Sequence, residues 1–193
     1  MEEHVRERYG EMPVSTIEIQ IERARERLRA FAKWQAEWRK SGYEIVDVEY
    51  NPATQIVVAG IQLRGQIDRI DRRDKELVVF DYKTGDDSPE TKHRNSKGWK
   101  DFQLPLYHYI LRQSGYAKAD DVIRLGYMTI SKNVKNIREQ IVNWDESVVQ
   151  DGIAEAVKLI EEIATRDWST ILPVIPPPQY SEDFEFICQD GIS

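Results

Sequence analysis

The chain has 193 residues, of which 40% are hydrophobic and 32% charged, a balance typical of one soluble globular domain rather than a disordered or membrane protein. No apolar stretch approaches the roughly 20 residues of a membrane-spanning helix. The charged start lacks the apolar core of a signal peptide. The single cysteine, Cys188, excludes an internal disulfide and favours an intracellular, cytoplasmic protein. The net charge of −7 argues mildly against a nucleic-acid partner, although divalent cations held by acidic residues reverse the sign of a site.

The first predicted element is a long amphipathic helix over residues 16–41. The segment "STIE" has the pattern of a capping box, and Gly42 is a natural stop. Apolar residues recur at spacings of three, four or seven, namely Ile17, Ile21, Ala24, Leu28, Phe31 and Trp38. We expect this stripe to pack on the chain's own sheet, and a coiled-coil partner helix is the alternative.

Three segments rich in β-branched residues follow, at 43–50, 55–73 and 76–83. Each shows partial alternation of apolar and polar residues. Short turns join them, so they predict three antiparallel strands that form a meander. In the second strand, Asp68 and Asp71 should lie on opposite faces, because side chains alternate along a strand.

The rest of the chain alternates between loop, helix and strand patterns. In order, these are a long polar loop, a helix, a fourth strand, an amphipathic helix and a proline-rich tail, at 84–98, 99–115, 122–130, 145–167 and 171–193. Pro105 is compatible with the first of these helices only in its first turn or at a kink. The order predicts one α/β domain over 16–170, with 1–15 as an N-terminal extension and the tail as part of the same domain.

The segment "VVFDYKTG" is an apolar run that ends on an acid and a base. Asp81 and Lys83 are two residues apart, so on a strand both side chains point to one face. If the second and third strands pair around a turn near residue 74, Asp68 lies opposite Asp81. Facing carboxylates repel unless a cation lies between them, and their oxygens suit Mg²⁺ or Mn²⁺. A surface ion pair is the commoner meaning of such a D-x-K segment taken alone.

Three motifs in order make the chain resemble the RecB-like branch of the PD-(D/E)XK nuclease superfamily. They are a G-x-x-D strand, a D-Y-K-[ST] strand and a Q-x-x-x-Y helix, here Gly65 with Asp68, Asp81 to Thr84, and Gln103 with Tyr107. The resemblance covers roughly residues 16–165. It implies a restriction-endonuclease-like α/β core, in which a helix, a three-strand meander, a helix and a strand follow one another, with flanking helices.

Residue by residue, the resemblance implies a metal site and a catalytic lysine. Asp68, Asp81 and the backbone carbonyl of Tyr82 would be metal ligands, and Lys83 the catalytic lysine. Glu49, late in the first strand, resembles a glutamate often seen before the G-x-x-D strand. It is a candidate further ligand, and a solvated charge at a strand end is the equal alternative.

Gln103 and Tyr107 are four residues apart and share one helix face, which the resemblance places in the active site near DNA. The preceding segment, "KHRNSKGWK", carries basic residues around a tryptophan. Contacts to phosphates or stacking on an unpaired base would suit this composition, as would an ordinary solvated loop. The residues concerned are Lys92, Arg94, Lys97, Trp99 and Lys100.

Two features depart from the pattern of the family. Relatives usually carry a helical histidine upstream of the G-x-x-D strand, whereas only His4 precedes that strand here, and His93 and His108 follow it as expected surface or packing residues. We therefore expect the chain to be the C-terminal part of a larger, helicase-linked protein. Many relatives bind a [4Fe–4S] cluster through four cysteines, and because Cys188 supplies one thiolate, no iron–sulfur cluster is expected.

The sequence thus predicts a Mg²⁺- or Mn²⁺-dependent deoxyribonuclease of exonuclease type that acts on single strands or ends in DNA double-strand break repair and recombination. A helicase domain or subunit is the expected partner, and no membrane association is expected. The alternative is a catalytically incomplete lobe that keeps the nuclease fold and binds DNA or serves as a scaffold, which the missing upstream histidine motivates. An RNA-directed nuclease is a third alternative.

Overall fold

The computed structural model of the protein describes residues 15–167. The predictions for His4 and for the tail with Cys188 lie outside the described residues. The elements in chain order are α2 (Ser15–Lys40), β1 (Glu44–Tyr50), β2 (Ile56–Val58), β3 (Ile61–Leu63), β4 (Ile67–Arg73), β5 (Glu76–Lys83), α3 (Pro89–His93), β6 (Arg94–Asn95), β7 (Gly98–Trp99), α4 (Gln103–Gln113), β8 (Val122–Thr129), η1 (Val134–Asn136), β9 (Arg138–Ile141) and α5 (Glu146–Thr165). No helix among the described residues is long and apolar enough to cross a membrane.

A five-stranded sheet with the order β1-β4-β5-β8-β9 forms the centre of the molecule. β1, β4 and β5 are antiparallel neighbours, which confirms the predicted meander. β8 lies parallel to β5 because the connection through α4 returns the chain to the same end of the sheet. β9 is a fifth strand that the sequence did not predict, since its four residues alternate too briefly to form a strand pattern. The expected restriction-endonuclease-like α/β core is confirmed.

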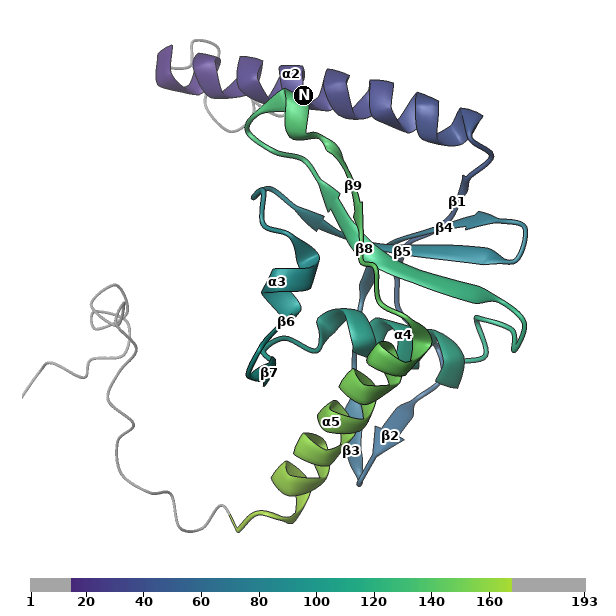
Figure 1. Cartoon of the computed structure of the whole chain (residues 1–193). Coiled ribbons are helices and arrows are strands. Elements are labelled where there is room, and N and C mark those ends of the chain that lie inside the picture. Colours follow the sequence, from purple (N-terminus) through teal and green to yellow (C-terminus); the bar gives the residue numbers. More distant parts are fainter. Residues whose placement is uncertain (1–14, 168–193) are drawn as a thin grey trace, which may run out of the picture.

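Helices cover both faces of the sheet, with α2 on one face and α4 and α5 on the other (Figure 1). The predicted packing of α2 on the chain's own sheet is confirmed by Phe31, Trp34 and Trp38, which lie against a cluster that contains the buried Phe80. The predicted apolar stripe is wrong in part, because Leu28 is 47% exposed while Trp34, outside the stripe, faces the sheet. The C-terminal half of the helix, with its large aromatic rings, makes this contact.

The predicted strand 55–73 is divided. Ala59 and Gly60 have φ angles of 49° and 81°, a left-handed pair that suits a tight hairpin turn, so β2 and β3 form a separate two-stranded sheet. The chain then passes close to α4 at Gly65, where a Cβ atom would lie 2.6 Å from Ile110 Cδ1. β4 alone joins the central sheet, and the prediction of one long strand is wrong over its first half.

The connection from β5 to α4 also differs from the prediction. Residues 84–98, expected as a loop, contain the short helix α3, and the β6–β7 hairpin closes at Trp99. This hairpin takes up the residues expected to begin the helix, so α4 starts at Gln103. Pro105 is the third residue of α4, in the first turn, where its missing N–H is not needed. α5 covers most of the predicted helix 145–167.

Candidate active site

The β4–β5 hairpin places two acidic residues side by side. Its register pairs Arg69 with Phe80, so one further step along the antiparallel ladder sets Asp68 opposite Asp81. Asp68 Oδ2 accepts a hydrogen bond from the backbone N–H of Tyr82, at 2.8 Å. The pairing predicted from the spacing of the two acids is confirmed, and both carboxylates come to one end of the sheet.

Asp81 and Lys83 lie on the same face of β5 and form an ion pair, with 2.6 Å between Nζ and Oδ2. Asp81 is 4% exposed, whereas the Lys83 side chain is 38% exposed. The ammonium also lies 5.2 Å from the ring centroid of Tyr127, the residue paired with Asp81 across β8, where the ring attracts the cation. The carboxylate is therefore at the floor of the site and the ammonium at its mouth.

The first turn of α4 completes the cluster. Gln103 Nε2 donates to Asp81 Oδ1 at 2.6 Å and to the Tyr107 hydroxyl at 2.8 Å, while Gln103 Oε1 accepts from Lys83 Nζ at 3.5 Å. Burial, together with the nearby carboxylates of Asp81 and Asp68, raises the pKa of Tyr107 to about 12. The Tyr107 hydroxyl therefore keeps its proton at neutral pH and can donate a hydrogen bond. The structure thus brings together five of the predicted site residues.

A buried histidine connects the site to the start of α4. His93 is fully buried, its Nδ1 lies 2.9 Å from the carbonyl oxygen of Asp101, and its Nε2 lies 2.8 Å from the Tyr127 hydroxyl. Because a carbonyl only accepts, Nδ1 carries the proton and Nε2 accepts from tyrosine. Burial lowers the pKa of His93, which favours this neutral form. Asp101 Oδ1 in turn accepts the backbone N–H of Gln103 at 2.8 Å.

Sequence reasoning missed this connection. It assigned His93 only a surface or packing role, and it singled out neither Tyr127 nor Asp101. The three residues come from the end of α3, from β8 and from the turn before α4. No motif or periodicity links these segments, so the sequence offered no signal for their meeting. Their contacts fix the start of α4, and with it Gln103, relative to β8, the strand that carries Tyr127.

Glu49 lies at the edge of the site. The β1–β4 register sets it level with Asp68, but its φ of 53° departs from regular strand geometry. Its exposed carboxylate accepts a hydrogen bond from the side chain of Gln66. Within residues 15–167, no group of three or more His, Cys, Asp and Glu side chains is arranged to hold a metal ion. The structure thus gathers two carboxylates, and the role of Glu49 as a further ligand stays a prediction.

Trp99 lies against α5. Its indole N–H donates to Asp151 Oδ2 at 3.1 Å, and its ring meets that of Trp144 edge to face, with 5.0 Å between centroids. Gly152 makes room for the ring, because a Cβ atom there would lie 2.7 Å from Trp99 Cζ2. The guanidinium of Arg94 lies 5.2 Å from the ring centroid. These contacts show a packing role for Trp99, and stacking on a base stays a prediction.

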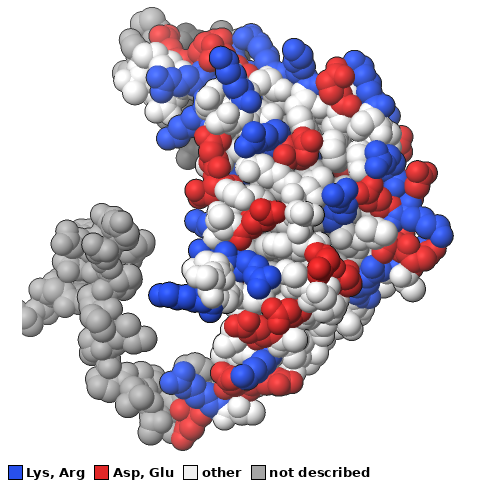
Figure 2. Space-filling model, in the orientation of Figure 1, with Lys and Arg blue, Asp and Glu red and all other residues white. Residues whose placement is uncertain are grey.

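The three lysines of the same segment, Lys92, Lys97 and Lys100, are exposed. Lys92 lies 3.6 Å from the carboxylate of Asp87, and Lys100 Nζ donates to the carbonyl of Thr91 at 2.8 Å. Lys97 lies in the β6–β7 turn, where its backbone N–H is hydrogen-bonded. Lys and Arg are interspersed with Asp and Glu over the face seen in Figure 2, without one broad basic area. Phosphate contacts by these lysines stay a prediction.

The donor atoms at the site fit a hard divalent cation. Asp81 Oδ2 is buried and has no hydrogen-bond partner among the described residues, and the Lys83 ammonium beside it provides a positive charge without hydrogen-bond geometry. Asp68 is opposite Asp81 on β4. Tyr82, whose backbone carbonyl is the third expected ligand, follows Asp81 on β5. Mg²⁺ binds through one or two carboxylates and keeps places for water and phosphate oxygens, so two acids and a carbonyl suffice.

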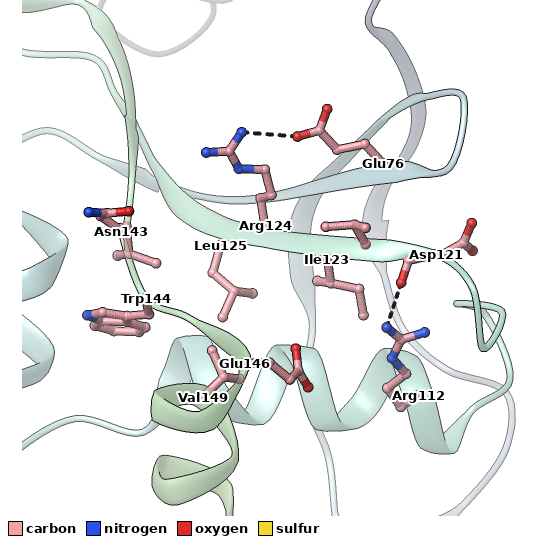
Figure 3. A pocket seen from close by; sticks show the side chains of 12 residues that line it. Glu76, Arg112, Asp121, Ile123, Arg124, Leu125, Asn143, Trp144, Glu146 and Val149 are labelled. Atoms are coloured by element: carbon pink, nitrogen blue, oxygen red, sulfur yellow. Dashed lines mark hydrogen bonds and ion pairs between the residues drawn. The ribbon is translucent and has the colours of Figure 1, made fainter.

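A hollow of about 460 Å³ lies at the opposite end of β5 (Figure 3). Glu76, the first residue of β5, lines it, whereas Asp81 is five residues further along the strand, about 17 Å away at 3.3 Å per residue. The charged side chains of this hollow have partners: Arg124 pairs with Glu76 at 3.2 Å, Arg112 donates to the backbone carbonyl of Asp121 at 2.6 Å, and the Asp121 carboxylate pairs with Arg72 at 2.9 Å. It is therefore separate from the acidic site.

The fold and the site together define a class of protein, an α/β nuclease domain with two acids and a lysine at the ends of paired strands. The profile of the PD-(D/E)XK nuclease superfamily matches residues 1–189, and the chain belongs to this superfamily of nucleases. No protein of curated function matches it. The crystal structure of a candidate exonuclease from Eubacterium rectale is similar, with a TM-score of 0.39 and 14% identity, over 80% of this chain and 59% of that chain. The chain thus spans less than two thirds of that protein's length.

Proposed function

We propose that this nuclease is a Mg²⁺- or Mn²⁺-dependent deoxyribonuclease of the RecB-like exonuclease type. Its substrate is single-stranded DNA or DNA ends in double-strand break repair and recombination, and a helicase domain or subunit supplies the strand. The observation that carries the proposal is the cluster at the end of β5, where Asp81 contacts both Lys83 and Gln103 beside Asp68.

The residues of the cluster have distinct roles in the proposed hydrolysis. Asp68, Asp81 and the carbonyl of Tyr82 would hold the metal ion, which when bound polarises the phosphodiester and lowers the pKa of water. Lys83, with its ammonium at the mouth of the site, offsets the negative charge that develops on the phosphate and orients the attacking water. Gln103 holds the Asp81 carboxylate in place through its amide N–H.

A cleavage assay on a single-stranded oligonucleotide with Mg²⁺ or Mn²⁺ tests this function. Asp81→Asn and Lys83→Met should each lower the cleavage rate by about 100-fold or more. Asp120→Asn and Lys158→Met make the same chemical changes at exposed positions far from the site along the chain, and should leave the rate unchanged. Circular dichroism checks that every variant folds. Equal cleavage by all variants would refute the assignment, and matched DNA and RNA strands decide the nucleic acid.

The alternative of a non-catalytic lobe is favoured by one observation, the Lys83 ammonium that already neutralises Asp81 at 2.6 Å. Such a lobe would bind DNA without cutting it and would hold no metal ion. Calorimetry with Mn²⁺ separates the two functions, because the nuclease should bind Mn²⁺ and lose that binding in Asp81→Asn. A protein that binds DNA, gives no heat with Mn²⁺ and cleaves nothing would be the scaffold.

A further inference from the structure

A small groove begins at the active site and follows α4. It has a volume of about 240 Å³ and lies between one face of α4 and the segment that connects β3 to β4. From α4 come residues at spacings of three and four, which share a helix face: Gln103, Leu106, Tyr107 and Ile110. The seven steps along the helix from Gln103 to Ile110 span about 10 Å at 1.5 Å per residue, so the groove leads away from Asp81 by roughly one nucleotide.

The floor of the groove is apolar and tightly packed. Leu63 and Leu106 are half-buried, and Ile110 is 4% exposed. Gly65 forms part of the wall, where a side chain would collide with Ile110 Cδ1 at 2.6 Å. The volume is below the roughly 300–1,000 Å³ of sites for drug-sized ligands. The groove therefore suits one small flat group with apolar faces, such as a single nucleobase.

The rim of the groove carries a positive charge that has no ion-pair partner among the described residues. Arg64 lines the groove, is exposed, and has no ion pair or hydrogen bond with any residue in the described part of the chain. Gln66, also on the rim, donates a hydrogen bond to the carboxylate of Glu49, so this carboxylate already has a partner other than Arg64. A guanidinium without a partner beside an apolar groove matches a ligand with a phosphate next to a base.

Gln103 and Tyr107 belong to both the groove and the acidic cluster. Gln103 contacts Asp81 through Nε2, and its side chain also lines the groove. A phosphate held at Asp81 would thus have the groove as its immediate neighbour. In a duplex the bases are stacked and paired inside and do not reach such a groove, whereas an unpaired strand presents them.

We infer that this groove takes the base of the unpaired nucleotide next to the phosphate at Asp68 and Asp81, while Arg64 holds the following phosphate. The inference rests on the proposed function and adds to it a place where the substrate strand is held in single-stranded form. The apolar lining makes the groove tolerant of base identity, because it meets the faces of the base rather than its hydrogen-bonding edges.

Abasic-site scanning tests the groove directly. Single-stranded oligonucleotides that each lack one base, at successive positions, are compared with the intact strand for cleavage with Mg²⁺. Their binding is compared by fluorescence anisotropy, also with Mg²⁺, in the Lys83→Met variant that is expected to cleave slowly. One abasic position should weaken binding and raise KM about 5- to 100-fold, and the neighbouring positions should have little effect. A uniform response across positions overturns the inference.

Variants then assign the effect to the groove. Leu106→Glu should abolish the dependence on the abasic position, whereas Leu159→Glu, at an exposed leucine of α5, should retain it. Arg64→Gln should weaken binding of all strands and reduce its salt dependence, and Arg138→Gln, at an exposed arginine of β9, should not.

The two readouts separate failure of the groove from failure of the proposed function. Cleavage of the intact strand with no positional effect leaves the nuclease assignment intact and refutes the groove. Position-dependent binding that Leu106→Glu removes, without any cleavage, supports the groove and refutes the nuclease activity. Absence of binding to every strand refutes the groove as well.

Discussion

The two aspartates of β4 should respond to substitution in opposite ways, although they are three residues apart in one segment. Asp68 lies in the candidate active site, whereas Asp71 lies on the other face of the strand, fully buried against α2. Arg69, 1% exposed, donates to Asp71 through two nitrogens at 2.7 and 2.6 Å. The indole N–H of Trp38 donates to the same carboxylate at 2.6 Å. Asp71→Ala therefore removes a support of the fold.

The magnitude follows from the charge left behind. Removing one partner of a buried ion pair costs about 3–5 kcal/mol, because the other charge stays buried without compensation. Replacement of both partners, as in Arg69→Met with Asp71→Leu, leaves no buried charge and should recover most of that loss. Trp38 loses its acceptor in both proteins, so this smaller cost of about 1–3 kcal/mol is common to them. The difference between the two variants isolates the unpaired Arg69.

Urea unfolding followed by tryptophan fluorescence measures these effects, and Trp34 and Trp38 beside the pair serve as reporters. With a slope of about 2 kcal/mol per molar urea, a loss of 3–5 kcal/mol lowers the midpoint by about 1.5–2.5 M. Asp68→Asn should shift the midpoint by less than about 0.5 M while it abolishes cleavage. An Asp71→Ala midpoint within about 0.5 M of the parent, or a double variant less stable than the single one, would contradict the reasoning.

Gly152→Ala should destabilise the protein in thermal unfolding, because overlap of the new Cβ with Trp99 costs roughly 1–3 kcal/mol, more than the gain in helix propensity of about 1 kcal/mol; an increase in melting temperature would be the contrary result. Burial lowers the pKa of His93 in the folded chain, so its stabilising effect is complete above the ordinary pKa of about 6.5 and is lost as the pH falls through the folded-state value. His93→Gln should flatten the decline of unfolding free energy between pH ~7 and ~5, and an unchanged slope would rule out this origin. Because burial raises the pKa of Tyr107 to about 12, Tyr107→Phe should remove one late step from the ultraviolet titration of tyrosinate, and loss of a step near the ordinary value of about 10 would contradict it.

The central motif could be predicted because its information is local. The period of two along a strand puts Asp81 and Lys83 on one face, and the spacing around a short turn puts Asp68 opposite Asp81. The long α2 was predicted for a similar reason, since its apolar residues repeat with the helical period and Gly42 follows its end. In each case the pattern lies within one segment or one hairpin.

The division of 55–73 was not predicted, because residues 56–61 form one run without a polar side chain that continues through the turn at Ala59 and Gly60. The exposure of Leu28 had a similar cause, since periodicity gives the faces of a helix but not how much of its length meets the sheet. Segment 84–98 lacked a repeating pattern, and its short helix and hairpin are held by contacts to distant residues such as Trp144.

The sequence by itself determined the element types of the core, the two acids and the lysine, and their meeting at one end of a hairpin. Only the tertiary structure decided that Asp71 is buried against α2 while Asp68 lies at the candidate site, that His93 fixes the start of α4 through Asp101, and that a groove runs from Gln103 past Arg64. The physical reason is that backbone periodicity acts between near neighbours, whereas these contacts join segments that come together only when the helices pack on the sheet.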